Sequence, residues 1–251
     1  MKKPIRHLLA ALALLLPLAA AAEEGPVLPK APIDIQDTES LQRGAQIFVN
    51  YCLSCHSANA MRYNRLTDIG LSEDQIKKNL MFASDKIGDT MHVAMDPQDA
   101  KKWLSNNPPD LSVEARARGA DWLYAYLRGF YRDDTRPTGW NNLVFDKVAM
   151  PHVLWQWQGD QQLKTVKNSD GTEEKQLVLV KAGSMTKLEN GHANTAEFDQ
   201  RMADLTNYLV FMAEPAQVKR LQIGYVVLMF LGLLLLPLAY FLKKEYWRDV
   251  H

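Results

Sequence analysis

Two cysteines and a histidine stand together as Cys52-Leu53-Ser54-Cys55-His56, and the chain contains no other cysteine. Two thiols at this spacing can add to the two vinyl groups of one haem, and the histidine that follows can bind the iron, so the pattern is typical of c-type haem attachment. A redox dithiol or half of a zinc site is the alternative. The missing second cysteine pair and the adjacent histidine both favour haem over zinc. The pattern therefore indicates an electron carrier with one covalently bound haem c.

The iron of such a haem takes a second axial ligand from a methionine or a histidine, or it has none and keeps an open position. The main candidates outside the terminal segments and the expected helix 196–213 are Met81, Met91, His92, Met95, Met150, His152 and Met185. Met150 precedes Pro151, and a residue before proline is driven into an extended conformation, which can present a thioether to the iron. His152 and the Met91–Met95 region remain the alternatives. A thioether raises the reduction potential relative to two histidines, and a haem with two protein ligands has no open position for oxygen.

Residues 1–22 have the pattern of an export signal. Basic residues at positions 2, 3 and 6 precede an apolar run from Leu8 to Leu18, and the alanines at 19–22 offer cleavage positions. The run of about 11 residues is short for a bilayer span, and an uncleaved anchor is the alternative. Export agrees with a covalent haem, which is attached outside the bacterial cytoplasm. Once haem occupies both cysteines, no thiol remains for a disulfide.

A second apolar segment, Leu221–Leu242, contains 22 residues and no charged side chain. A helix of this length measures ~33 Å, close to the thickness of the hydrocarbon core. Basic residues bound both ends, tyrosines lie near them, and Pro237 is tolerable in a membrane helix. A buried helix of a soluble protein is the alternative, but this segment offers no polar face. The sequence predicts a periplasmic domain 23–216, a membrane anchor 221–242 and a cytoplasmic tail 243–251.

Charge and length limit the class of the exported part. The chain has 29 basic and 29 acidic residues, and loss of the three basic signal residues leaves 26 against 29. A slightly acidic domain argues against nucleic-acid binding and is compatible with docking of a basic partner. The roughly 190 residues between the apolar ends suffice for one domain with a sizeable core.

Three helices are expected to position the haem motif. The first, 41–51, starts from Thr38 or Ser40 as the N-cap and delivers Cys52 to the haem edge. The second and third, 112–130 and 196–213, show apolar residues at helical spacing. The segment 177–180 is a short strand candidate after a turn within 165–175, and the remainder is rich in loops.

Taken together, these residues resemble the cytochrome c1 family, the haem subunits of quinol–cytochrome c oxidoreductase (the cytochrome bc1 complex). The resemblance covers nearly all of the chain after the signal segment. Besides the haem motif and the terminal anchor, it rests on Pro108-Pro109-Asp110-Leu111-Ser112, Arg116-Ala117-Arg118-Gly119, Ala149-Met150-Pro151 and Ala213-Glu214-Pro215.

The resemblance implies a fold and a set of haem contacts. The implied fold is mainly α, a class I cytochrome c-like haem domain with long loop insertions and one C-terminal transmembrane helix, in which Gly44 lets the first helix approach Leu205, Tyr208 or Leu209. Met150 matches the sixth ligand of the family. Arg118 matches an arginine near a haem propionate, and Pro109 matches a proline that packs near the haem. A disulfide found in many family members has no counterpart here.

The resemblance also implies partners. An iron–sulfur (Rieske) protein, reduced beside cytochrome b, would pass one electron to this haem, and a c-type cytochrome would collect it on the periplasmic side. A membrane-anchored c-type subunit of a terminal oxidase is the alternative within electron transfer. A periplasmic haem sensor is a less favoured one, because the few residues after the anchor leave no room for an output domain.

Overall fold

The computed structural model describes residues 28–93, 95–104, 106–167, 171 and 173–248. The predicted signal segment 1–22 lies outside these residues, as does the end of the predicted tail. The helical elements are α2 (Thr38–Ile47), η2 (Phe48–Cys52), η3 (Tyr63–Ile69), α3 (Glu73–Asn79), α4 (Pro97–Leu104), α5 (Glu114–Arg118), α6 (Ala120–Arg128), α7 (Trp155–Gln158), α8 (Ala196–Ala213) and α9 (Gln217–Arg248). The strands are β1 (Ala58–Arg62), β2 (Thr90–Met91), β3 (Phe130–Arg132), β4 (Trp140–Asn142), β5 (Gly159–Lys167), β6 (Glu173–Ala182), β7 (Lys187–Glu189) and β8 (His192–Asn194).

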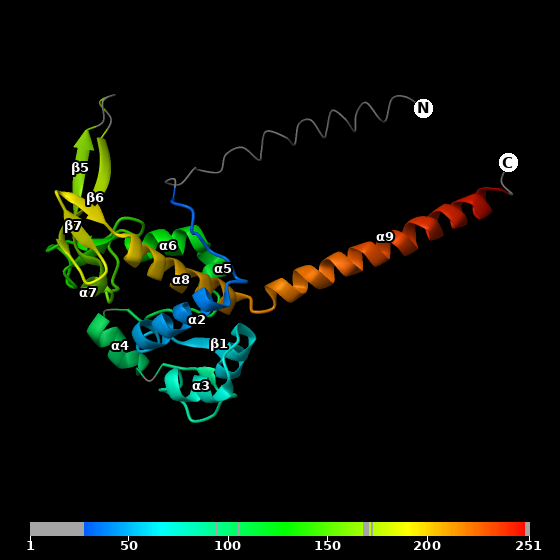
Figure 1. Cartoon of the computed structure of the whole chain (residues 1–251), viewed down its shortest axis with the longest axis horizontal. Coiled ribbons are helices and arrows are strands. Elements are labelled where there is room, and N and C mark those ends of the chain that lie inside the picture. The colour runs from blue at the N-terminus through cyan, green and yellow to red at the C-terminus, as the bar shows by residue number, and fades with distance from the viewer. Residues whose placement is uncertain (1–27, 94, 105, 168–170, 172, 249–251) are drawn as a thin grey trace.

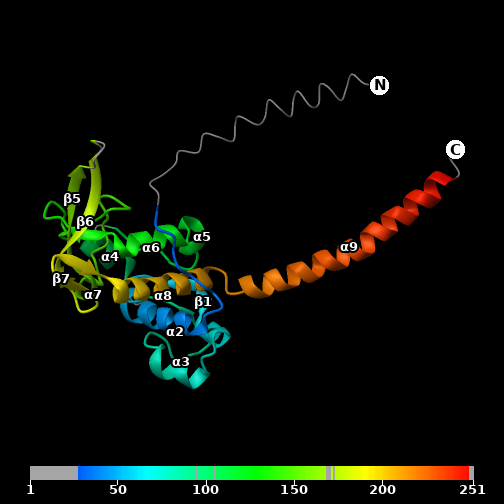
Figure 2. The same ribbon diagram turned by 45° about the horizontal axis from the view of Figure 1, so that its top comes forward.

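Helices form the framework, and the strands are local additions to it. In the described part of the chain, the strands pair only two by two, as β1–β2, β3–β4, β5–β6 and β7–β8, each pair antiparallel. The main apolar core lies between α2, η3, α3 and α8. Figures 1 and 2 show α2 and α8 side by side in both views, with the β5–β6 hairpin at the end of the domain away from α9.

The closest helix packing is the crossing of α2 and α8 at Gly44. A Cβ placed on Gly44 would lie 2.6 Å from the Cβ of Tyr208 and closer still to the carbonyl oxygen of Asp204. Only glycine allows two helix backbones to approach this far, because every other residue adds a Cβ. The expected contact between Gly44 and Tyr208 is confirmed. The crossing fixes α2, and with it the start of the haem motif, against the helix that leads to the membrane.

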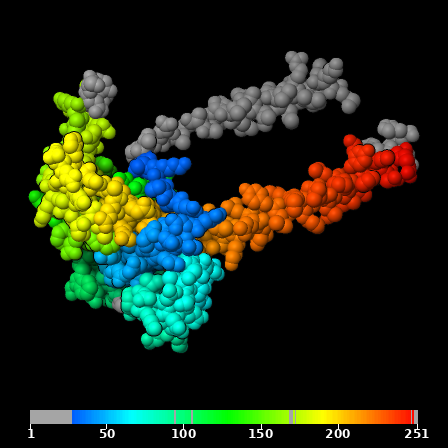
Figure 3. All heavy atoms as spheres, in the orientation of Figure 1, coloured from blue at the N-terminus to red at the C-terminus, as the bar shows by residue number. Residues whose placement is uncertain are grey.

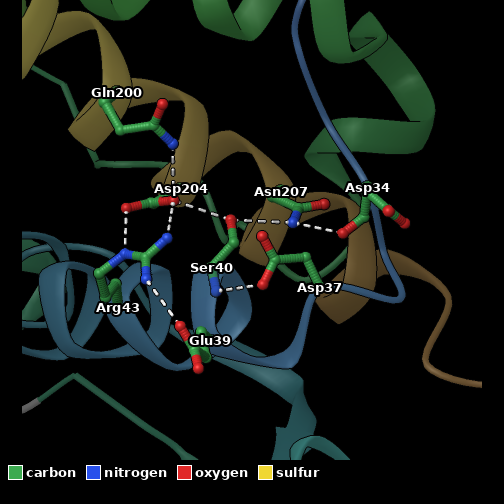
Figure 4. Close-up of polar contacts among 8 residues, drawn as sticks. All are labelled: Asp34, Asp37, Glu39, Ser40, Arg43, Gln200, Asp204 and Asn207. Atoms are coloured by element: carbon green, nitrogen blue, oxygen red, sulfur yellow. Dashed lines mark hydrogen bonds and ion pairs between the residues drawn. The ribbon is translucent and has the colours of Figure 1, made fainter.

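A buried polar cluster fastens the same crossing (Figure 4). The carboxylate of Asp204 is fully buried and accepts hydrogen bonds from Ser40 Oγ at 2.8 Å and from Arg43 Nε at 2.7 Å. Asn207 on the next turn of α8 donates to Ser40 Oγ at 3.0 Å and to the backbone oxygen of Asp34 at 2.7 Å. Because the charge of Asp204 is paired and hydrogen-bonded, it can remain buried in this position.

The first helix differs from the predicted helix 41–51. It starts earlier, ends at Ile47, and continues as the wider π-helical turn η2 to Cys52. The predicted N-cap was wrong, since the side chain of Asp37 accepts the backbone N–H of Ser40 at 3.0 Å. The side chain of Ser40 instead points inward to the Asp204 cluster. An acidic cap suits the N-terminus of a helix because of the helix dipole.

The predicted helix 112–130 is two helices, α5 and α6, separated at Gly119. Gly119 has φ 87° and ψ 156°, a conformation that ends the helical hydrogen-bond ladder and that glycine adopts readily. The third helix is confirmed, because α8 spans Ala196–Ala213. The strand candidate 177–180 lies within β6, and β5 and β6 extend into both ends of the expected 165–175 turn.

The C-terminal helix α9 includes the predicted anchor 221–242 and is longer at both ends. Its segment Gln217–Tyr246 has the length and composition of a membrane span, and its large apolar side chains are exposed. Figure 3 shows α9, coloured orange to red, standing clear of the domain. Exposed apolar side chains over this length need a hydrocarbon environment.

Candidate haem site

The six site residues predicted from the sequence come together at one cavity of about 390 Å³. This volume is in the usual range for small-molecule and cofactor pockets. Its described lining contains Cys52, Cys55, His56, Pro109, Arg118 and Met150, together with mostly apolar neighbours such as Leu111, Trp122, Leu123, Tyr126, Phe145, Val148 and Val153. η2 and the turn after it supply the cysteines and the histidine, α5 supplies Arg118, and the loop after β4 supplies Met150. An apolar cavity with few polar groups suits a large planar hydrophobic cofactor.

A tight turn holds the two cysteines and the histidine in position. The backbone N–H groups of Cys55 and His56 both donate to the carbonyl oxygen of Cys52, at 3.0 Å and 2.8 Å. The turn directly continues η2, whose last residue is Cys52. Both thiols and the imidazole therefore face one cavity from a single turn of chain.

The imidazole of His56 is oriented by the segment that carries Pro109. His56 Nδ1 lies 2.8 Å from the carbonyl oxygen of Pro109, which can only accept, so Nδ1 carries the proton. Nε2 then has the free lone pair that a metal needs. Burial lowers the pKa of His56, which favours the same neutral form. A backbone carbonyl at the second ring nitrogen is the usual support of a metal-binding histidine.

The surroundings of the thiols disagree with the two alternatives to haem. Burial, assisted by the neighbouring Cys55, raises the pKa of the Cys52 thiol to about 12, whereas redox-active dithiols have a lowered pKa. In the part of the chain that the structure describes, no group of three or more His, Cys, Asp and Glu residues could hold a metal ion. The site thus fits a haem, which needs two thiols and one imidazole from this turn.

Among the candidate second ligands, only Met150 belongs to the described lining of the cavity. Its sulfur accepts a hydrogen bond from Tyr126 Oη at 3.4 Å, and its side chain packs on the cluster of Phe130, Trp140 and Val148. His152, although close in sequence, is buried and stacked on Phe130, with ring centroids 4.7 Å apart.

The other candidates lie elsewhere. Met91 is fully buried in the main core, where Tyr208 Oη lies 3.7 Å from its sulfur. Met81 packs on the same core, and Met185 packs on a second cluster around Phe198. The remaining two, His92 and Met95, are not among the residues that line the cavity.

Arg118 lines the cavity, and Glu114 and Trp122 hold its guanidinium. Its Nε donates to Glu114 Oε1 at 3.2 Å, and its guanidinium carbon lies 4.9 Å from the ring centroid of Trp122. No hydrogen bond from its two terminal nitrogens to another described residue occurs. These nitrogens can therefore bind a carboxylate of a haem bidentately.

Several lining residues were not predicted as site residues. Trp122 and Tyr126 stack on each other with ring centroids 4.9 Å apart, and Phe145 meets Trp122 edge to face. The spacing of Trp122 and Tyr126, four residues apart within α6, is a sequence signal that could have revealed this wall of the cavity. Phe145 has no comparable signal, because it lies on an irregular loop.

Comparison with known proteins agrees with this site. The sequence model of the Cytochrome C1 family matches residues 29–250. The chain belongs to the cytochrome c1 family. The chain is 46% identical to cytochrome c1 of Allochromatium vinosum over 97% of its own length and 98% of that protein. It is 30% identical to cytochrome c1 of Rhodospirillum rubrum over 85% of this chain and 83% of that one.

A further relative carries a different name. The chain is 52% identical to a protein of Nitrosomonas europaea called ammonia monooxygenase gamma subunit, over 98% of this chain and 99% of that protein. The family model nevertheless covers nearly the whole chain, so the family assignment is unaffected.

Membership confirms several expectations from the sequence. As a cytochrome c1-family protein, the chain is a membrane-anchored electron-transport subunit of the cytochrome bc1 type, with a cytochrome c1 fold and one covalently bound haem c. The family assignment does not favour a terminal oxidase subunit or a haem sensor.

Proposed function

We propose that the cavity holds the haem c, with Cys52 and Cys55 as its attachment points and His56 as one axial ligand. Met150 is the second axial ligand. The observation that carries this proposal is that one apolar cavity is lined by two thiols, one correctly protonated imidazole and one thioether. Haem supplies reversible one-electron chemistry when bound. The protein holds it, excludes water from it and tunes its potential.

Two further residues support the cofactor. Pro109 provides the carbonyl oxygen that keeps the proton on Nδ1 of His56. Arg118 offers its two terminal nitrogens to a haem propionate while Glu114 holds its Nε. A positive charge near the haem disfavours the oxidised, more positive form, and thus raises the reduction potential.

The haem domain, residues 23–216, lies on the periplasmic side, and α9 anchors it in the membrane with a short cytoplasmic tail. The signal-like residues 1–22 support this orientation, because they direct the segment that follows them across the membrane. In this location the protein takes one electron from a Rieske iron–sulfur protein held beside cytochrome b, and passes it to a c-type cytochrome. It performs no bond-making catalysis of its own.

Replacing Met150 by leucine tests the ligand assignment. The Met150→Leu protein is expected to have a sharply lower reduction potential, because the iron loses a ligand that favours its ferrous form. Redox titration of the purified, full-length protein measures this potential. Met185→Leu is the matched control, since Met185 is also partly buried but packs on another cluster. An unchanged potential in Met150→Leu would assign the ligand role to another residue.

Replacing Arg118 by alanine tests the propionate contact. We expect a smaller decrease in reduction potential, because only a nearby charge is lost while both axial ligands remain. Arg116→Ala, an exposed arginine two residues away, is the control. Identical potentials in Arg118→Ala and the unmodified protein would show that Arg118 is a surface residue without a haem contact.

Purification from native membranes tests the partners. An iron–sulfur protein and a cytochrome b are expected to accompany the full-length chain. The name of the Nitrosomonas europaea relative supplies a second candidate, electron transfer to a monooxygenase. Recovery with monooxygenase subunits, and without an iron–sulfur protein and cytochrome b, would favour that second candidate.

A further inference from the structure

The loop between β4 and Met150 is held almost entirely by side chains. Leu143 N–H donates to the carbonyl oxygen of Gly129 at 2.9 Å. From Val144 to Met150, no hydrogen bond joins the backbone to another backbone group of the described residues. An irregular segment with so few backbone bonds takes its conformation from whatever side chains bind it.

Two neighbouring asparagines on β4 provide most of the side-chain hydrogen bonds that hold this loop. Asn142 Oδ1 accepts the N–H of Val144 at 2.9 Å and that of Phe145 at 3.2 Å. Asn141 Oδ1 accepts the N–H of Lys147 at 2.8 Å, and its Nδ2 donates to Asp146 Oδ1 at 2.9 Å. Each amide thus binds two successive points of the loop.

The same asparagines are tied to the wall of the cavity. Asn142 Nδ2 donates to the carbonyl oxygen of Tyr126 at 2.8 Å, and Tyr126 donates in turn to the sulfur of Met150. Asn141 Nδ2 also donates to Asp133 at 3.0 Å. Only 4% of Asn141 and 1% of Asn142 is exposed, so a loop group that loses its hydrogen bond to either amide is left buried without a partner, at a cost in free energy.

The loop also contains an unfavourable backbone conformation that needs support. Lys147, three residues before Met150, has φ 58°, in the left-handed region that a lysine rarely adopts. Its N–H is held by Asn141, and its carbonyl oxygen accepts a hydrogen bond from Arg136 Nη2 at 3.2 Å. Without these contacts the turn would relax toward a more common conformation, and the direction of Val148-Ala149-Met150 would change.

We infer that Asn141 and Asn142 are positioning residues that hold the Met150 thioether at the haem iron. The inference rests on the proposed function, which makes Met150 the second axial ligand. The pair sets the equilibrium between the attached and the detached thioether, and thereby the reduction potential. Neither side chain belongs to the Cys52–His56 motif that attaches the haem.

Competition with carbon monoxide measures this equilibrium. Carbon monoxide binds ferrous haem only where the thioether has left, so its apparent affinity rises in proportion to the detached fraction. For full-length Asn142→Ala holoprotein in detergent we expect an apparent affinity at least about tenfold higher, since the substitution removes three hydrogen bonds and the net loss of even one buried hydrogen bond changes an equilibrium by about that factor. The absorption band that marks sulfur ligation of ferric haem should weaken, and the reduction potential should fall.

Asn207→Ala is the matched control. Asn207 is 1% exposed, as is Asn142, and its amide makes two hydrogen bonds, but these join α8 to Ser40 and Asp34. We expect this variant to unfold more easily while its carbon monoxide affinity stays normal. Equal increases in Asn142→Ala and Asn207→Ala would show a general loss of stability and would overturn the inference.

A second variant covers poor folding of the first. Asn141→Asp keeps the size of the side chain and its acceptor oxygen. It replaces the Nδ2 donor to Asp133 and Asp146 by a carboxylate oxygen that faces those two carboxylates. It is expected to raise the carbon monoxide affinity at neutral pH as well. Normal affinity in whichever variant accumulates as haem protein refutes the positioning role. Met150→Leu is measured in parallel, and normal ligation there refutes the ligand assignment itself.

Discussion

Replacing Gly44 by alanine is expected to push apart α2, which leads into the haem motif, and α8, which leads to the membrane helix. The new Cβ would lie 2.6 Å from the Cβ of Tyr208 and closer still to the backbone of Asp204. Neither neighbour can move away by a change of rotamer, because one is a Cβ and the other is main chain. The clash can be relieved only by a shift of α2 relative to α8.

The expected cost follows from two opposing contributions. Overpacking of a well-packed contact costs roughly 1–3 kcal/mol and occasionally more. Alanine is favoured over glycine within a helix by about 1 kcal/mol, which acts in the opposite direction. Because the obstacle is backbone, we expect the upper end of the first range and a net loss of about 2 kcal/mol. For a domain of this size that corresponds to a decrease in Tm of about 4–8 °C.

Thermal unfolding of the detergent-solubilised holoprotein, followed by circular dichroism and haem absorption, provides the measurement. Gly88→Ala is the control, since a Cβ at Gly88 has no neighbour within 4 Å and the backbone there is not left-handed. That variant is expected to unfold within a degree or two of the unmodified protein. If Gly44→Ala has the same Tm as Gly88→Ala, the close crossing of α2 and α8 does not exist in solution.

Two further outcomes are expected. Tyr126→Phe should lower the reduction potential with the methionine still bound. The substitution removes the hydroxyl whose Oη lies 3.4 Å from the Met150 sulfur, which makes that sulfur a stronger ligand of ferric iron. A redox titration that shows an unchanged or higher potential contradicts this. Burial raises the pKa of Tyr126, so its hydroxyl is present as the donor at neutral pH. Burial alone would raise the pKa of Asp110, but hydrogen bonds, the strongest of them from Ser112, outweigh it and hold that pKa below its usual 3.8. The ionised carboxylate of Asp110 therefore stabilises the fold above pH 3.8, and this contribution is lost as the pH falls below that value. Asp110→Asn should weaken the acid dependence of unfolding, and an identical acid transition in both proteins would contradict this.

Regular elements with a strong local signal could be predicted from the sequence. The helix 196–213 was located correctly, because its apolar stripe is long and Pro215 closes it. The helix 112–130 was not, because the periodic pattern runs across Gly119 without a visible interruption. A single left-handed glycine leaves the apolar spacing intact while it breaks the hydrogen-bond ladder, so periodicity alone cannot detect it.

The hydrogen bonds that hold the site were beyond reach of the sequence. Nothing in the pattern around Asn141 and Asn142 indicates that their amides bind a loop, since asparagines before an irregular segment are common. In the same way, Ser40 has the residue type of an N-cap, but it bonds to a carboxylate more than 160 residues later in the chain. Such contacts depend on which elements meet in space.

The chemistry available to this protein follows from residue types and their spacing: two thiols and a histidine at fixed spacing, a proline-flanked thioether, and a terminal apolar segment long enough to cross a membrane. These properties are local, because they depend on residue type and on distance along the chain. The folded structure selects which of the candidate methionines and histidines shares a cavity with the thiols, and which ring nitrogen of His56 carries the proton. Both depend on segments roughly 50 to 100 residues apart that come together when α2 packs on α8 and the loops close over the cavity.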